Sequence, residues 1–305
     1  MPTAVGENGG ILQKSGTCRS SKGGSSLTPS RVLKLLRSGQ LVRVGGVSRV
    51  TDPWIAEVMG AIGYDVVWLD LEHRDFGLEV VDGISRACRL AGLDLMVRIE
   101  KSGYHSPMQA LEFGANGLMV PHIRSAEEAR RWVEWCRFPP MGKRGLDGAG
   151  ADSYYGLDPV LPYIEHANRE TFLAFQIEDK EAVEQIEQIA AVPGYDMLFV
   201  GPGDLSLSLG IPMQLDHPLM EDAMVKVNAA CKRHGKWWGT TSGSAAAAQH
   251  VVDLGASMFT AGGDHGALVN GFRQSFESFR GVTAKNAPED STEKNAVGEG
   301  FVRPY

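Results

Sequence analysis

Two carboxylates of this chain stand directly after short apolar stretches. Glu178 follows the stretch Phe172–Ile177, and Asp204 follows the stretch Met197–Val200 within the sequence Gly201-Pro202-Gly203-Asp204. If these stretches are neighbouring strands, the two like charges converge and repel each other unless a cation lies between them. Mg²⁺ is the expected ion, with Mn²⁺ or Co²⁺ as substitutes. The alternative is that each carboxylate caps the helix that follows it.

Three more polar residues stand at or just beyond the ends of earlier apolar stretches. Asp70 ends the stretch 65–70, His73 follows it by three residues, and Arg98 lies in the stretch 95–99. An arginine in an apolar strand needs a partner, which is either a structural salt bridge or an anionic ligand such as a carboxylate or an enolate. His73 is a candidate general base, whose tautomer Asp70 or a bound water would set.

The glycines of the turn before Asp204 predict an anion-binding site. Without a Cβ, Gly201 and Gly203 let a ligand approach the backbone, and the amides of Gly203 and Asp204 would bind a carboxylate or, alternatively, a phosphate. Gln176 adds an amide at the end of the preceding stretch. Four other residues either line the mouth of the same site or are ordinary surface residues: His105, His122, Tyr154 and Tyr155.

These residues need a fold that brings strand ends together. Short apolar stretches alternate with helix-like ones eight times between about 41 and 281, with one long loop at about 139–170. Nearly continuous apolar strands are typical of a parallel sheet, and eight such units predict a (β/α)8 TIM barrel. A doubly wound open sheet would carry a Gly-x-Gly-x-x-Gly fingerprint, which Gly45-Gly46-Val47 does not match. Barrel active sites lie at the carboxyl ends of the strands.

Composition excludes several other classes of function. Of the 305 residues, 22% are charged and the formal net charge is −7, which argues against a nucleic-acid-binding surface. No apolar run reaches the ~18 residues of a membrane span, and we see no secretory signal. Four cysteines without a CxxC pair indicate a reduced, cytoplasmic protein. We expect a disordered tail at 1–30, a catalytic barrel at 31–281 and a polar extension at 282–305.

Several motifs together resemble the HpcH/HpaI aldolase family, the class II, metal-dependent 2-oxo acid aldolases exemplified by 4-hydroxy-2-oxoheptanedioate aldolase. In order over about 31–281 they are LDLEH (69–73), VRI (97–99), MVPHIRSAEEAR (119–130), RFPPMGKRG (137–145), FQIED (175–179) and FVGPGDLS (199–206). The resemblance implies a barrel of the phosphoenolpyruvate/pyruvate type. It also implies a homo-hexamer, a trimer of dimers in which the last helix is exchanged between subunits.

The resemblance implies roles for the polar residues as well. These roles are metal binding by Glu178 and Asp204, a base at His73 beside Asp70, enolate and carboxylate binding at Arg98, and a polar contact at Gln176. The implied activity is a lyase that cleaves or forms 4-hydroxy-2-oxo acids through the enolate of pyruvate, with oxaloacetate decarboxylation at the same site. Its partners would be a 2-oxo acid, pyruvate or oxaloacetate, and an aldehyde or another acceptor.

Other functions stay open. Trp68, near Asp70, and Tyr154 in the long loop resemble the macrophomate synthase branch of the family, which decarboxylates oxaloacetate and forms a carbon–carbon bond to a different acceptor. In that case Trp68 would contact the substrate. A Schiff-base aldolase would need a lysine within a strand, and none of the eight stretches has one. A barrel that binds an oxo acid without turnover, or a lyase that needs a CoA thioester, are further alternatives.

Overall fold

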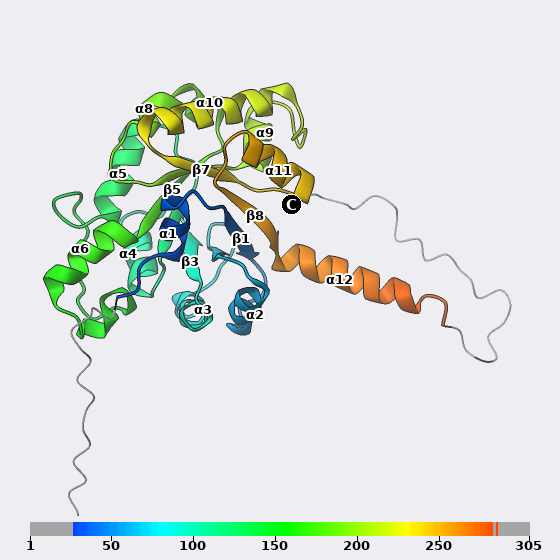
Figure 1. Ribbon diagram of the computed structural model, residues 1–305, viewed down its shortest axis with the longest axis horizontal. Helices are drawn as coiled ribbons and strands as arrows, with labels where there is room; N and C mark the ends of the chain where they lie inside the picture. The colour runs from blue at the N-terminus through cyan, green and yellow to red at the C-terminus, as the bar shows by residue number, and fades with distance from the viewer. Residues whose placement is uncertain (1–26, 283–284, 286–305) are drawn as a thin grey trace, which may run out of the picture.

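Eight parallel strands form a closed barrel in the computed structural model, which describes residues 27–282 and 285 (Figure 1). The strands are β1 (Val42–Val47), β2 (Val66–Asp70), β3 (Asp94–Arg98), β4 (Gly117–Val120), β5 (Phe172–Ile177), β6 (Met197–Val200), β7 (Trp237–Thr240) and β8 (Met258–Gly263). Each strand pairs with the next in sequence, and β8 closes the barrel on β1. The predicted (β/α)8 barrel is confirmed, and the doubly wound open sheet is wrong.

Helices alternate with the strands along the chain. They are α1 (Arg31–Arg37), α2 (Trp54–Ile62), α3 (Leu78–Ala91), α4 (His105–Glu112), α5 (Ala126–Cys136), the 3₁₀ turn η1 (Ala151–Gly156), α6 (Val160–Glu170), α7 (Lys180–Glu184), α8 (Ile186–Ala190), α9 (Pro202–Ser208), α10 (Pro218–His234), α11 (Ala245–Asp253) and α12 (Asp264–Phe279). Local sequence sets several helix ends. Ser125 accepts a hydrogen bond from the Glu128 amide at the start of α5, and Gly92 and Gly235 end α3 and α10 in the left-handed conformation.

The helix α6 lies where the sequence predicted a long loop. Pro159 and Pro162 resemble helix breakers in the sequence, but they fall at the N-cap and in the first turn of α6, where proline is tolerated. Tyr163 and Ala167 then turn one apolar face toward Phe138. The Phe138 and Tyr163 rings meet edge to face with their centroids 5.5 Å apart, so this helix is held by its own small core.

The inside of the barrel is an apolar core, and α1 closes its amino-terminal end. Val44, Met96 and Phe199 from three strands belong to one buried cluster with Val32 and Leu33 of α1. A second, larger cluster fills the space between the strands and the outer helices. The polar strand ends predicted from the sequence lie at the opposite, carboxyl-terminal end of the barrel.

The last helix, α12, runs away from the barrel instead of covering its wall (Figure 1). Asp264 at its start is buried, whereas Leu268, Phe272, Phe276 and Phe279 are exposed. Spacings of three and four residues place these side chains on one side of the helix. A contiguous apolar stripe of this kind marks an interaction surface.

The terminal segments predicted from the sequence lie mostly outside the described residues. The tail predicted at 1–30 is described only from residue 27, and the extension predicted at 282–305 only at 282 and 285. Within the described part of the chain, no helix is both long enough and apolar enough to cross a membrane.

Asp94, the first residue of β3, ties α1 to the barrel. Its carboxylate accepts hydrogen bonds from Ser30 Oγ at 2.6 Å and from the backbone amides of Arg31 and Val32 at 3.1 and 2.9 Å. The change Asp94→Ala removes the acceptor of these hydrogen bonds and leaves the donors unpaired in the interior. We therefore expect the free energy of unfolding to fall by about 3 kcal/mol.

The matched control is Asp82→Ala on α3, which removes an exposed ion pair with Arg86. This control should cost no more than about 0.5 kcal/mol. Urea unfolding followed by circular dichroism measures both variants. If the Asp94 variant were as stable as the Asp82 variant, this carboxylate would not be what holds α1 in place.

Candidate active site

The register between β2 and β3 places Asp70 opposite Arg98 at the carboxyl end of the barrel. Arg98 is only 7% exposed. Its Nε and Nη2 both lie 2.9 Å from Asp70 Oδ1, and its Nη1 lies 3.0 Å from Glu72 Oε2. Arg98 therefore has salt-bridge partners that fix the orientation of its guanidinium group, and its binding of an anionic ligand stays a prediction.

The pairing with Arg98 also sets the charge state of Asp70. Burial alone would raise the pKa of this carboxyl group, but the hydrogen bond and the positive charge of Arg98 outweigh burial and hold the pKa below its usual value. Asp70 is consequently ionised at neutral pH.

Glu178, just beyond β5, is a buried carboxylate with an unused oxygen. The residue is 1% exposed, and its Oε1 accepts a hydrogen bond of 2.8 Å from the backbone amide of His122. Its Oε2, like Oε1 of the neighbouring Gln176, has no hydrogen-bond partner among the described residues. Burial, reinforced by the negative charge of Glu72, raises the pKa of Glu178 to about 7. A bound cation would restore the ionised form, because it replaces the lost solvation.

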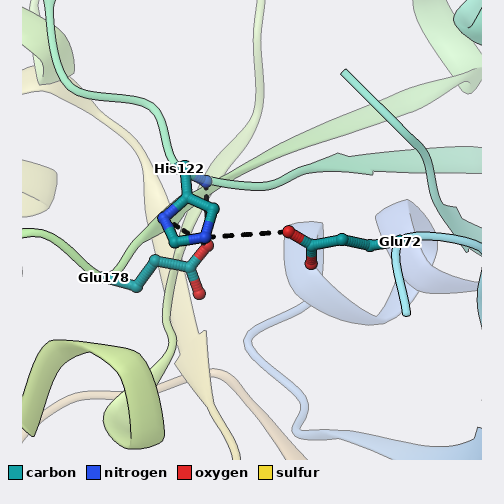
Figure 2. A group of neighbouring side chains, drawn as sticks. All are labelled: Glu72, His122 and Glu178. Atoms are coloured by element: carbon teal, nitrogen blue, oxygen red, sulfur yellow. Dashed lines mark hydrogen bonds and ion pairs between the residues drawn. The ribbon is translucent and has the colours of Figure 1, made fainter. Parts of the chain in front are cut away.

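Figure 2 shows how Glu72, His122 and Glu178 face one another from three different loops. Among the described residues, these three form a cluster whose potential ligand atoms all lie within 4.8 Å of one another. His122 Nε2 lies 3.7 Å from Glu72 Oε1, and His122 Nδ1 lies 3.5 Å from Glu178 Oε1. Carboxylate oxygens and an imidazole nitrogen are common ligands of divalent metals.

Sequence reasoning singled out Glu178 in this cluster but missed Glu72 as a ligand and gave His122 no role beyond the mouth of the site. The signal for Glu72 was its spacing, because it lies two residues after Asp70 and returns to the same side of the chain. A signal for His122 was its position directly after β4. His122 also has a positive φ of 49°, a conformation that is uncommon for residues with a Cβ and recurs at functional sites.

Asp204 lies apart from this cluster, in the first turn of α9, and is partly exposed. Neither α7 nor α9 has a side-chain hydrogen bond at its amino-terminal cap, but Asp204 is an acidic residue in the first turn of α9, where the helix dipole favours a negative charge. Gly203, beside Asp204, has open space around the position of a Cβ. The pairing of Asp204 with Glu178 therefore stays a prediction.

Gly201 is required by the two side chains beside it. A Cβ at this position would lie 2.3 Å from Glu178 Oε2 and 2.8 Å from Gln176 Nε2. Any larger residue would push the carboxylate and the amide out of place. The glycine predicted to admit a ligand thus also makes room for the residues that would bind it.

Among the described residues, the His73 imidazole makes no hydrogen bond to the Asp70 side chain, which corrects the sequence-based hypothesis that Asp70 sets its tautomer. Asp70 Oδ1 is engaged by Arg98 and accepts from the backbone amides of Glu72 and His73 at 3.2 and 3.4 Å. The imidazole is 52% exposed, with Nε2 3.7 Å from Glu72 Oε2.

Trp68 lies under Arg98 inside the barrel. The Arg98 Cζ atom is 5.0 Å from the centroid of the Trp68 ring, and the ring meets Phe199 edge to face at 5.5 Å. Its Nε1 is buried without a hydrogen-bond partner among the described residues. Trp68, Gln176 and Glu178 thus each have a buried polar atom without a hydrogen-bond partner among the described residues.

Comparison with known proteins supports the resemblance to the HpcH/HpaI aldolase family that the sequence motifs indicated. Residues 47–271 match the profile of the family described as HpcH/HpaI aldolase/citrate lyase. A 4-hydroxy-4-methyl-2-oxoglutarate aldolase of Chaetomium globosum is 34% identical over 212 residues, which cover 69% of this chain and 79% of that protein.

Solved structures agree with the sequence comparison. The HpcH/HpaI aldolase from Desulfitobacterium hafniense superposes with a TM-score of 0.78 at 31% identity, covering 84% of this chain and 98% of that one. Macrophomate synthase superposes with a TM-score of 0.70 at 25% identity, covering 83% of this chain and 90% of that one. The resemblance inferred from the motifs is confirmed: the chain belongs to the HpcH/HpaI aldolase/citrate lyase family and is an enzyme of the lyase class.

Proposed function

We propose that this enzyme is a metal-dependent aldolase that cleaves or forms 4-hydroxy-2-oxo acids through the enolate of pyruvate. The observation that carries the proposal is the buried Glu178 carboxylate, whose Oε2 has no hydrogen-bond partner among the described residues. It faces Glu72 and His122, close to an arginine that is fixed in orientation. The name of the Chaetomium globosum relative, an aldolase of a substituted 2-oxo acid, supports the same reaction class.

A divalent metal ion fits these residues. Glu178 and Asp204 would hold it, as the family resemblance implies, and Glu72 and His122 are further candidate ligands. Oxygen ligands suit Mg²⁺, whereas a contribution from the imidazole would favour Mn²⁺ or Co²⁺. When bound, the ion supplies Lewis acidity that stabilises negative charge on the 2-oxo acid.

The side chains at the barrel end bind and orient the 2-oxo acid. Arg98 donates hydrogen bonds to its carboxylate or to the developing enolate oxygen, and its orientation is set in advance by Asp70 and Glu72. The unused polar atoms of Trp68 and Gln176 make further contacts with the substrate. The backbone amides of Gly203 and Asp204 complete the predicted carboxylate site.

His73 moves the proton in this scheme. In the cleavage direction its imidazole accepts the proton of the 4-hydroxyl group, through a water molecule, and the C3–C4 bond breaks to give the enolate of pyruvate and a carbonyl product. This product is an aldehyde or, from 4-hydroxy-4-methyl-2-oxoglutarate, a second pyruvate. The imidazole contacts the side chain of Glu72, whose Oε2 lies 3.7 Å from His73 Nε2. Decarboxylation of oxaloacetate yields the same enolate without this proton transfer, so both reactions can share the site.

The second candidate function is that of macrophomate synthase, in which the enolate adds to an acceptor other than an aldehyde. Trp68 favours it, because a buried indole Nε1 without a partner is a donor aimed at a substrate group. A Schiff-base mechanism is not favoured, since none of the eight strands contains a lysine. A metal-dependent enolate is common to both remaining candidates.

A second copy of this chain would cover α12. The exposed side chains of Leu268, Phe272 and Phe276 form an apolar stripe on a helix that leaves its own barrel (Figure 1). We propose that copies exchange this helix in dimers, three of which form the hexamer implied by the family resemblance. Exchange buries the stripe without any change in the barrel.

The proposed location is the cytoplasm. The three cysteines among the described residues, Cys88, Cys136 and Cys231, are free and buried. Burial raises the pKa of each thiol to about 12, so none is a reactive thiolate. Unpaired cysteines of this kind suit a reducing compartment.

Removal of the metal should abolish the reaction. Incubation with EDTA is expected to stop pyruvate release from 4-hydroxy-4-methyl-2-oxoglutarate, and added Mg²⁺ or Mn²⁺ should restore it, because the enolate charge loses its main stabilising partner. Activity that resists the chelator would contradict a metal-dependent mechanism.

The ligand set can be read from Mn²⁺ binding, measured by electron paramagnetic resonance. Glu178→Gln should weaken binding by at least about 10²-fold, since it removes the buried charge. Asp204→Asn and His122→Gln then separate the predicted ligand pair from the observed cluster, because a true ligand lowers affinity and a bystander does not. The exposed Asp216→Asn serves as the control variant. Unchanged affinity in the Glu178 variant would move the metal site elsewhere.

His73→Asn should lower the kcat of aldol cleavage by about 10²- to 10⁴-fold, the range of a lost general base. The same variant should retain oxaloacetate decarboxylation and Mn²⁺ binding, because neither uses the imidazole. Steady-state assays with the two substrates make the comparison. Equal loss of both activities would assign His73 a structural role.

Phe272→Arg on α12 should convert the assembly into smaller species, because a charge then replaces the most exposed aromatic ring of the stripe. Light scattering after size-exclusion chromatography measures the molar mass. Leu90→Arg, at an exposed position of α3, is the matched control and should leave the mass unchanged. A wild-type chain that elutes as a monomer would refute the exchange.

A further inference from the structure

We infer that Asp264 and Arg74 are positioning residues that hold His73 in place. The inference rests on the proposed function, in which His73 is the base. Asp264 is the first residue of α12 and is 3% exposed. It lies far from His73 in the sequence, but a chain of hydrogen bonds connects the two through the loop after β1.

The first link joins Asp264 to that loop. Asp264 Oδ2 accepts hydrogen bonds from three successive backbone amides, those of Ser48, Arg49 and Val50, at 3.0, 2.6 and 2.7 Å. Its Oδ1 accepts from Ser48 Oγ at 3.2 Å and from the His265 amide at 2.7 Å. Both carboxylate oxygens are thus saturated by donors, and the loop at 48–50 is wrapped around one buried charge.

The second link joins the loop to His73. Arg74 Nε donates to the backbone carbonyl of Ser48 at 2.8 Å, and Arg74 Nη1 donates to the backbone carbonyl of His73. The guanidinium therefore bridges the loop after β1 and the loop after β2. Its fork geometry suits this role, since one group reaches two carbonyls at once.

His73 needs such support because its side chain has little of its own. The imidazole is 52% exposed, and its contact with Glu72 is 3.7 Å long. The backbone is held by two bonds: the amide donates to Asp70 at 3.4 Å, and the carbonyl accepts from Arg74. The position of the imidazole therefore depends on the backbone of His73. The hydrogen bond from Arg74 holds the carbonyl group of this residue, and the bond to Asp70 holds its amide. A small displacement of a base costs rate even when the base itself is unchanged.

The test is a set of double-mutant cycles on the full-length enzyme. Asp264→Asn replaces one acceptor oxygen with an amide group that faces donors. Arg74→Lys keeps the charge but has a single nitrogen, which cannot take the places of both Nε and Nη1 of the planar fork. Each change should lower the kcat of aldol cleavage by about 10- to 100-fold, with KM and Mn²⁺ affinity unchanged. In the His73→Asn background neither change should lower the rate further, because the group through which it acts is gone.

Oxaloacetate decarboxylation distinguishes positioning from general structural damage, because structural damage would lower this activity as well. It should continue at the wild-type rate in both single variants, since it does not use His73. Asp75→Asn, an exposed substitution in the same loop as His73, is the control and should change neither activity.

Three outcomes overturn the inference. Additive losses in the cycle would mean that Asp264 and Arg74 act on something other than His73. Equal loss of aldol cleavage and decarboxylation in the Arg74 variant would indicate general disruption of the site. A wild-type enzyme that releases no pyruvate from any 4-hydroxy-2-oxo acid would overturn the proposed function and this inference together, whereas an active wild type with an additive cycle overturns the inference alone.

Discussion

A carboxylate buried at the end of a strand is unstable as an anion unless a proton or a cation neutralises it, and Glu178 is such a group. Several neighbouring groups contact the Glu178 carboxylate or leave space for it. The His122 amide supplies a hydrogen bond to one of its oxygens, and Gly201 leaves room for the other because it has no Cβ. Arg98, which also acts electrostatically on Glu178, forms its ion pairs with Asp70 and Glu72. The carboxylates of Asp70, Glu72 and Glu178 therefore lie close to a single arginine, and the proposed metal ion would balance the excess of negative charge.

Much of this arrangement follows from features that can be read along the chain. Parallel strands covered on both faces must be apolar, so each polar residue at a strand end stands out, and a barrel collects these ends at one rim. Asp70, Arg98, Gln176 and Glu178 were predictable for that reason. The side chain that pairs with each of these residues was not predictable, because pairing depends on distances between loops. Asp70 had Arg98 and His73 within reach, and the buried charge of Arg98 decided the outcome. The sequence did not indicate Glu72 and His122 as ligands, because only the fold brings their three loops together (Figure 2).

The site also separates rigid from adaptable parts. Arg98 is clamped between carboxylates and packs on Trp68, and both lie within strands. Groups on strands are held more firmly than groups on loops, which suits the step that both proposed functions share, the formation of an enolate. His73 lies on a loop and is half-exposed, and the proposed function gives it the proton transfer that involves the acceptor. Differences between family members in the acceptor can therefore arise from loop residues, while the enolate chemistry of the barrel stays the same.

Through Asp264, α12 also supports the loop at residues 48–50, in addition to carrying the apolar stripe. The helix is 16 residues long and most of it stands clear of its own barrel, so a sequence-based truncation would treat it as dispensable. Tolerance to truncation, however, depends on the hydrogen bonds and burial of the backbone that is removed. A chain cut before α12 loses the buried carboxylate around which residues 48–50 are wrapped, together with the apolar stripe. A shortened protein, whether made for crystallisation or by proteolysis, would keep its eight strands and yet lose the support for a loop at the mouth of the barrel.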